Sequence, residues 1–157
     1  MRHPLTIRPT TLWILALALL VALPDAASAA NSKKNRKKQQ RPIAMGTSGG
    51  NINNIESIFC YSGTLGALLE MEDGGSTRYF VLSNNHIIAR ENKGDAGEGI
   101  VQPGLAETNC SQRNNDVIAE LSGFIKLKPA GKNVVDVAIA ETIPEAVDAA
   151  GNILSIG

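Results

Sequence analysis

Residues 65–83 read LGALLEMEDGGSTRYFVLS, and this stretch decides the fold class. Two apolar runs, residues 65–71 and residues 79–83, flank the segment EDGGS at residues 72–76. Both runs have the length of a β-strand, and glycines supply the positive φ that a tight hairpin turn needs. The stretch therefore predicts an antiparallel β-hairpin.

The chain around this hairpin continues the same pattern of short apolar runs separated by turn residues. We expect further strands at residues 99–102 (GIVQ), 117–124 (VIAELSGF) and 134–140 (VVDVAIA). The last of these is almost continuously apolar, which is typical of a core strand. The sequence thus predicts an all-β domain over residues 60–157, most simply an antiparallel β-barrel or a sandwich.

One closing segment favours a helix instead. Residues 143–150 read IPEAVDAA, and the proline at position 144 suits the first turn of a helix. We therefore expect a short helix after the last strand.

Composition places the chain among ordinary globular proteins. Its 157 residues include 15 Lys and Arg against 15 Asp and Glu, and 43% are hydrophobic, too many for a disordered chain. Its 2 cysteines are too few for a disulfide scaffold or a zinc site. The neutral total nevertheless conceals an uneven distribution of charge along the chain.

The first residues have the pattern of an export signal. Residues 12–23 (LWILALALLVAL) are uninterruptedly apolar, Arg2 and Arg8 precede them, and ASAA at residues 27–30 follows. The run is shorter than the roughly 20 residues of a membrane span. Residues 1–30 are therefore predicted to be a cleavable signal peptide, which implies a secreted or periplasmic protein without a transmembrane anchor.

The next segment is predicted to be a disordered linker over residues 31–59. Residues 31–41 (NSKKNRKKQQR) are basic with no apolar residue, and residues 44–56 (AMGTSGGNINNIE) are rich in Gly, Asn and Ser. For the basic part, an anionic surface, a polyanion or no partner at all remains open, and a solvated tail is the favoured interpretation. From Pro42 onward, seven Lys and Arg face fourteen Asp and Glu, so nucleic acid is not expected to bind the folded region.

Two polar residues stand out against the apolar strands. His86 follows the predicted strand in SNNHIIA, and Asp136 lies inside VVDVAIA. A buried carboxylate is costly without a donor or cation, and a histidine N–H is a suitable donor. An aspartate that orients a histidine is half of a nucleophilic-catalysis arrangement. The spacing leaves the alternatives open that His86 is a surface or capping residue and that Asp136 faces water at a strand edge.

Four segments together resemble a known family. They are GTLGAL (63–68), YFVLSNNHIIA (79–89), IVQPG (100–104) and NVVDVAIA (133–140). They are similar to the amino-terminal part of trypsin-like, chymotrypsin-fold serine peptidases, most of all the secreted bacterial subgroup that resembles plant narrow-leaf-type proteins. The resemblance covers residues 63–157 and implies a chymotrypsin-like first barrel. It also implies that His86 is the general base and Asp136 the carboxylate that orients it.

The family's nucleophile has no counterpart that we can assign. The resemblance implies two six-stranded barrels with the catalytic serine in a Gly-x-Ser-Gly turn of the second, and residues 137–157 are too few for another barrel. Ser155, the one serine there, lacks the surrounding glycines that would expose it and form an oxyanion hole. Ser48 lies in GTSGG but precedes His86 within the predicted linker, so we do not expect it to be the nucleophile either.

Other kinds of site are weaker. Cys60 and Cys110 could form a disulfide in an oxidising compartment, and neither lies in a glycine-rich turn that would suit a cysteine nucleophile. Residues 95–98 (DAGE) lack the alternating oxygen ligands of a calcium loop and are more typical of a solvated turn. We therefore expect no metal and no cofactor.

The resemblance therefore predicts a secreted trypsin-like endopeptidase domain whose substrate would be a protein or peptide. The full family activity would be peptide-bond hydrolysis through an acyl-enzyme, and we expect this chain to be truncated before the nucleophile and to be inactive alone. The alternative is a non-catalytic secreted module that binds a partner on a protease-like barrel.

Overall fold

The computed structural model describes residues 34–156, in which β-strands dominate. The strands are β1 Ser48–Asn51, β2 Ile55–Glu56, β3 Phe59–Cys60, β4 Gly63–Thr64, β5 Ala67–Asp73, β6 Ser76–Ser83, β7 Gly99–Val101, β8 Val117–Phe124 and β9 Ala138–Thr142. The helices are α3 Asn85–Ile88 and the 3-10 turns η1 Leu105–Thr108 and η2 Asn114–Asp116. The prediction of a mostly β, antiparallel domain is confirmed.

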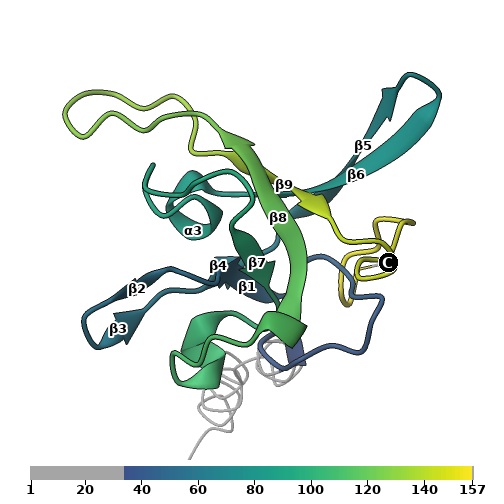
Figure 1. Cartoon of the computed structure of the whole chain (residues 1–157), viewed down its shortest axis with the longest axis horizontal. Helices are drawn as coiled ribbons and strands as arrows, with labels where there is room; N and C mark the ends of the chain where they lie inside the picture. The colour runs from purple at the N-terminus through teal and green to yellow at the C-terminus, as the bar shows by residue number, and fades with distance from the viewer. Residues whose placement is uncertain (1–33, 157) are drawn as a thin grey trace, which may run out of the picture.

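A single 7-stranded sheet forms the body of the domain, in the order β4-β1-β7-β8-β9-β6-β5. Its two edge strands, β4 and β5, are separated in the chain by Leu65 and Gly66 alone. The N–H of Gly46 donates to the carbonyl of Leu65 at 2.7 Å, and the N–H of Gly66 donates to the carbonyl of Leu82 at 2.9 Å. The sheet is therefore curled, because its opposite edges must meet at this bend (Figure 1).

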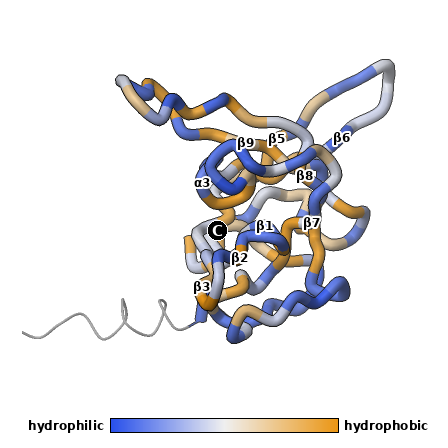
Figure 2. The backbone as a smooth tube through the Cα atoms, turned by 60° about the vertical axis from the view of Figure 1, so that its left-hand side comes forward, coloured by the Kyte–Doolittle hydropathy of each residue, from blue (hydrophilic) through white to orange (hydrophobic). Residues whose placement is uncertain are grey.

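The predicted hairpin is confirmed as β5 and β6. Asp73 pairs with Ser76, so Gly74 and Gly75 form the turn, with φ of 59° and 88°. The hairpin projects beyond the rest of the sheet, and its tip is hydrophilic (Figures 1 and 2). Of the other expected strands, β7 and β8 form where the sequence predicted them.

The core fills the concave side of the curled sheet with buried aliphatic side chains. Its largest fully buried members include Ile43, Met45, Leu65, Ile88, Ile100 and Ile118. Because α3 contributes Ile88 to this cluster, the short helix is anchored to the sheet by apolar packing. No helix within residues 34–156 has the length and apolar character needed to cross a bilayer.

Much of the predicted linker is folded, so this prediction is wrong for residues 43–59. β1 is wholly buried, and it pairs with both β4 and β7. A Cβ on Gly49 would lie 2.6 Å from a methyl group of Leu65, so the glycine lets the backbone approach the core closely. The glycine content that suggested flexibility therefore belongs to a tightly packed strand.

The basic segment also contacts the domain over the part that the structure describes. The Lys38 ammonium pairs with the buried carboxylate of Asp116. The buried amide of Gln102 accepts from the N–H of Gln39 and donates to the carbonyl of Lys37, both at 2.9 Å. Residues 37–39 are thus held by partners far away in the sequence, contrary to the predicted disorder. The predicted signal peptide lies outside the described residues.

The C-terminal segment differs from its prediction as well. Residues 143–150 form no helix, since Val147 makes a parallel bridge to Ile43 and the N–H of Asp148 donates to the carbonyl of Ile43 at 2.9 Å. A second bridge joins Met45 to Ile153. The tertiary pairing of this segment with residues 43–45 replaces its local helical preference.

A disulfide joins Cys60 in β3 to Cys110, which follows η1. The sequence left this disulfide open as a possibility. The bond fixes the small β2–β3 hairpin to the segment after η1, on the same side of the domain as α3 (Figure 1).

Candidate functional site

His86 is presented by α3, directly after β6. The hydroxyl of Ser83 at the end of β6 donates to the carbonyl of Thr64 at 2.8 Å, which fixes the strand end. Ile87 and Ile88 then turn into the core, whereas the His86 side chain remains 46% exposed. The apolar neighbours thereby anchor the helix and leave the imidazole on the surface.

Asp136 lies outside the strand in which the sequence placed it. β9 begins only at Ala138, and Val134 is 88% exposed, so the apolar run VVDV belongs to the loop before the strand. The prediction of a strand over residues 134–140 is therefore wrong for its first half. The Asp136 side chain is 31% exposed, and the carboxylate is only partly removed from water.

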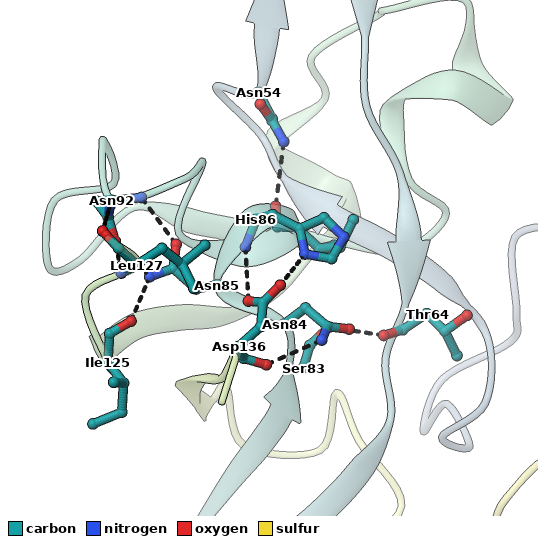
Figure 3. A network of polar contacts seen from close by, with 11 residues as sticks. Asn54, Thr64, Ser83, Asn84, Asn85, His86, Asn92, Ile125, Leu127 and Asp136 are labelled. Carbon is teal, nitrogen blue, oxygen red and sulfur yellow. Dashed lines mark hydrogen bonds and ion pairs between the residues drawn. The ribbon is translucent and has the colours of Figure 1, made fainter. Parts of the chain in front are cut away.

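The structure brings His86 and Asp136 together (Figure 3). Oδ2 of Asp136 contacts Nδ1 of His86, and Oδ1 accepts from the His86 main-chain N–H at 3.3 Å. The side chain of Asn84 donates to the main-chain carbonyl of Asp136 at 3.0 Å. The carboxylate therefore holds both the ring and the backbone of His86.

The electrostatics keep this carboxylate ionised. Partial burial raises the pKa of Asp136, but hydrogen bonds from the ring and main chain of His86 lower it more, and the net pKa lies below the ordinary 3.8. An ionised carboxylate only accepts hydrogen bonds, so Nδ1 of His86 must carry a proton. In the neutral ring, Nε2 is then the nitrogen with the free lone pair.

His86 borders a pocket of about 310 Å³. The other lining residues are Asn54, Glu56, Tyr61, Ser62, Ile87, Arg90, Glu91 and Lys93. Across this pocket Lys93 and Glu56 form an ion pair, with 2.5 Å between Nζ and Oε1, and the Lys93 ammonium lowers the pKa of Glu56. The pocket beside the imidazole is thus polar and charged.

The hydrogen-bond partners of Ser48 and Ser62 and the disulfide partners of both cysteines are groups other than His86. Ser48 lies in the buried strand β1 and donates to Oε2 of Glu107 at 2.7 Å. Ser62, at the pocket, accepts from the N–H of Ala106 at 2.9 Å. Ser155 lies in the C-terminal turn that packs near Met45. Both cysteines are in the disulfide.

The described part of the chain offers no metal centre. Residues 34–156 contain no group of three or more His, Cys, Asp and Glu side chains placed to hold an ion. The chemistry of the site therefore has to be argued from the imidazole, its carboxylate and the polar pocket.

Sequence reasoning missed the asparagines around the pair. Asn84 and Asn85 directly precede His86, and Asn85 is fully buried and hydrogen-bonded (Figure 3). The only sequence signal was the pair of asparagines directly after an apolar strand. Their partners lie in segments that the sequence alone does not bring together.

Comparison with known proteins assigns no relative: no family profile, curated protein or solved structure matches the chain. Any function must therefore be argued from the geometry of the His86–Asp136 pair.

Proposed function

We propose that His86 and Asp136 are the proton-transfer pair of a trypsin-like serine endopeptidase site in a secreted protein. The observation that carries the proposal is the contact of the Asp136 carboxylate with Nδ1 of His86. This contact fixes the tautomer and stabilises the imidazolium that forms when Nε2 takes a proton from a nucleophile. The substrate would be a protein or peptide.

The fold supports the same proposal. A curled antiparallel sheet whose edges meet at Leu65 and Gly66 suits the first barrel of a chymotrypsin-like peptidase. In such an architecture the His–Asp pair lies on one barrel and the nucleophile on another. Since no serine or cysteine of residues 34–154 contacts Nε2, we assign the nucleophile to polypeptide outside these residues.

The pair can be tested in the chain as it exists, with p-nitrophenyl acetate. Nε2 of a neutral imidazole attacks the ester carbonyl, p-nitrophenolate leaves, and water then hydrolyses the acetyl-imidazole. Because Nε2 carries the free lone pair of the neutral ring, we expect hydrolysis above that of the H86A variant. D136N should also be slower, because the amide can donate to Nδ1 and shift the proton to Nε2. Equal rates for the wild type and H86A would refute the proposed role of His86.

A fluorophosphonate probe tests the assignment of the nucleophile. Such probes label an activated serine, so we expect no labelling of the 157-residue protein. Labelling of a serine within residues 34–154 that disappears in H86A would contradict the assignment of the nucleophile to polypeptide outside these residues.

A non-catalytic binding module is the second candidate, and one feature favours it. Ile58 and Phe59 at the turn of the β2–β3 hairpin are 81% and 65% exposed, which suits a protein contact.

A further inference from the structure

The loop of residues 125–137 carries Asp136 and stands out from the sheet (Figure 1). At its base the N–H of Ile125 donates to the carbonyl of Val137 at 3.0 Å. Near its tip Asn133 makes two hydrogen bonds to the main chain of Lys128, at 2.8 and 3.1 Å. These bonds lie within the loop, so they do not determine where the loop lies relative to α3. Asn84 bonds the main-chain carbonyl of Asp136 directly, and further contacts must fix the base of the loop.

Asn85 provides the first of these contacts from inside α3. Its side chain is fully buried, and Nδ2 donates to the carbonyl of Ile125 and to Oδ1 of Asn92, both at 2.8 Å. Oδ1 of Asn85 accepts from the main-chain N–H of Asn92 at 2.9 Å. Both donor hydrogens and the oxygen of this amide are therefore used, which is the satisfied state that a buried amide requires.

Asn92 provides the second contact, which is to Leu127, two residues after Ile125 in the loop. Its Nδ2 donates to the carbonyl of Leu127 at 2.9 Å, and its Oδ1 accepts from the N–H of Leu127 at 2.7 Å. The side chain thus pairs with the loop backbone as a neighbouring strand would. Together, Asn85 and Asn92 join the base of the loop to the helix that presents His86 (Figure 3).

The backbone around Asn92 is held in an uncommon conformation. Arg90, Glu91 and Asn92 have φ of 52°, 53° and 74°, in the left-handed region that non-glycine residues rarely adopt. Such residues persist where surrounding contacts over-determine them, and they cluster at functional sites. Here the over-determining contacts include the bonds between Asn92 and Asn85.

We propose that Asn85 and Asn92 are positioning residues that hold Asp136 at the correct distance from Nδ1 of His86. The inference rests on the proposed function of the His86–Asp136 pair. Asn85 precedes His86 in the helix and bonds the loop at Ile125, and Asn92 bonds it at Leu127. The same loop returns to the helix at Asp136. A displacement of this loop by ~1 Å would be enough to break the contact with Nδ1 and lower the reactivity of Nε2.

The test uses N92G in the full chain. Glycine accepts the positive φ of position 92, so the variant removes the side-chain bonds to Leu127 without new backbone strain. N92G also removes the bond from Asn85 to Oδ1 of Asn92. N133A is the control, because it deletes two hydrogen bonds within the same loop but none that joins the loop to Asn85 or Asn92. Two quantities are measured: the His86-dependent hydrolysis of p-nitrophenyl acetate, and the NMR signal of the His86 Nδ1 proton.

We expect N92G to lower the His86-dependent rate by about tenfold, less than the ~10²-fold that a misplacement of ~1 Å can cost in a complete site. The Nδ1 proton signal should broaden or disappear. N133A should keep both the rate and the signal. Loss of the signal separates positioning from a general loss of stability, which urea unfolding of both variants measures independently.

Unchanged rate and signal in N92G would overturn the inference, and so would an equal loss in N133A. If N92G does not fold, N92D replaces it. Aspartate tolerates the left-handed conformation. It keeps the oxygen that accepts from the N–H of Leu127 but loses the amide group that donates to the Leu127 carbonyl. A lowered rate and a weakened Nδ1 proton signal in N92D would support the proposal, and an unchanged rate and signal would refute it. A wild-type rate equal to that of H86A would instead refute the proposed function itself.

Discussion

The Cys60–Cys110 disulfide should supply a large part of the stability of this domain. It closes a loop with a sequence separation of 50. In the chain-entropy model such a cross-link removes ~14 cal/mol/K from the unfolded ensemble, or about 4 kcal/mol at 25 °C. This is a substantial fraction of the 5–15 kcal/mol that stabilises a typical domain.

Urea unfolding of the oxidised and reduced wild-type protein measures this effect without a change of sequence. With a slope of about 2 kcal/mol/M, the midpoint should fall by about 2 M on reduction. The double variant C60S/C110S should match the reduced protein, because the cross-link rather than the thiols carries the effect. The contact between His86 and Asp136 does not involve either cysteine, so the Nδ1 proton signal should survive reduction. A midpoint shift below about 0.5 M with an unchanged slope would refute the argument.

Two further predictions concern charged pairs. K38M leaves the buried Asp116 carboxylate without its ammonium partner. Breaking a buried ion pair costs about 3–5 kcal/mol. Because the Lys38 side chain is 54% exposed, we expect urea unfolding to show a smaller loss of stability, about 1–2 kcal/mol. The folded state lowers the pKa of Asp136 below its unfolded value of about 3.8, so the ionised carboxylate stabilises the fold. The wild type should therefore be more stable than D136N, fully so above the unfolded pKa. This difference should disappear as the pH falls through the lower folded pKa. Urea midpoints measured from pH 7 down to pH 2 test this dependence.

The matched control for K38M is K34M, since Lys34 is an exposed lysine of the same segment with no ion pair among the described residues. Equal effects of the two variants would show that Asp116 does not depend on Lys38. For Asp136, a stability difference that persists unchanged at pH 2 would show that the carboxylate charge does not stabilise the fold.

Local patterns in the sequence were sufficient for the central hairpin, whereas the pairing of His86 with Asp136 followed from the resemblance to the peptidase family. Residues 72–76 determine a turn by their own conformational preferences, and β5 and β6 formed on either side of it. The expectation that His86 would meet Asp136 was also correct, although its reasoning assumed a carboxylate inside a strand. The contact arises instead because the loop before β9 passes α3.

The elements that the sequence did not predict depend on long-range packing. β1 consists of small residues whose composition is that of a linker. Only the packing of Leu65 against Gly49, which the sequence does not show, distinguishes it as a buried strand. The ordered basic segment depends on Gln102 and Asp116, which are distant in the chain. Local sequence cannot show such partners, because composition records the residue types but not the surfaces that they meet.

The acidic outer strand of the projecting hairpin has a consequence for how copies of the protein meet. Within the described residues β5 pairs only with β6, so its other side offers unpaired backbone groups to a strand of another molecule. Glu70, Glu72 and Asp73 lie on this strand, and identical strands from two copies would bring these carboxylates together. Their repulsion opposes edge-to-edge association at neutral pH. Without that repulsion, the strand that keeps two molecules apart becomes the one through which they can aggregate.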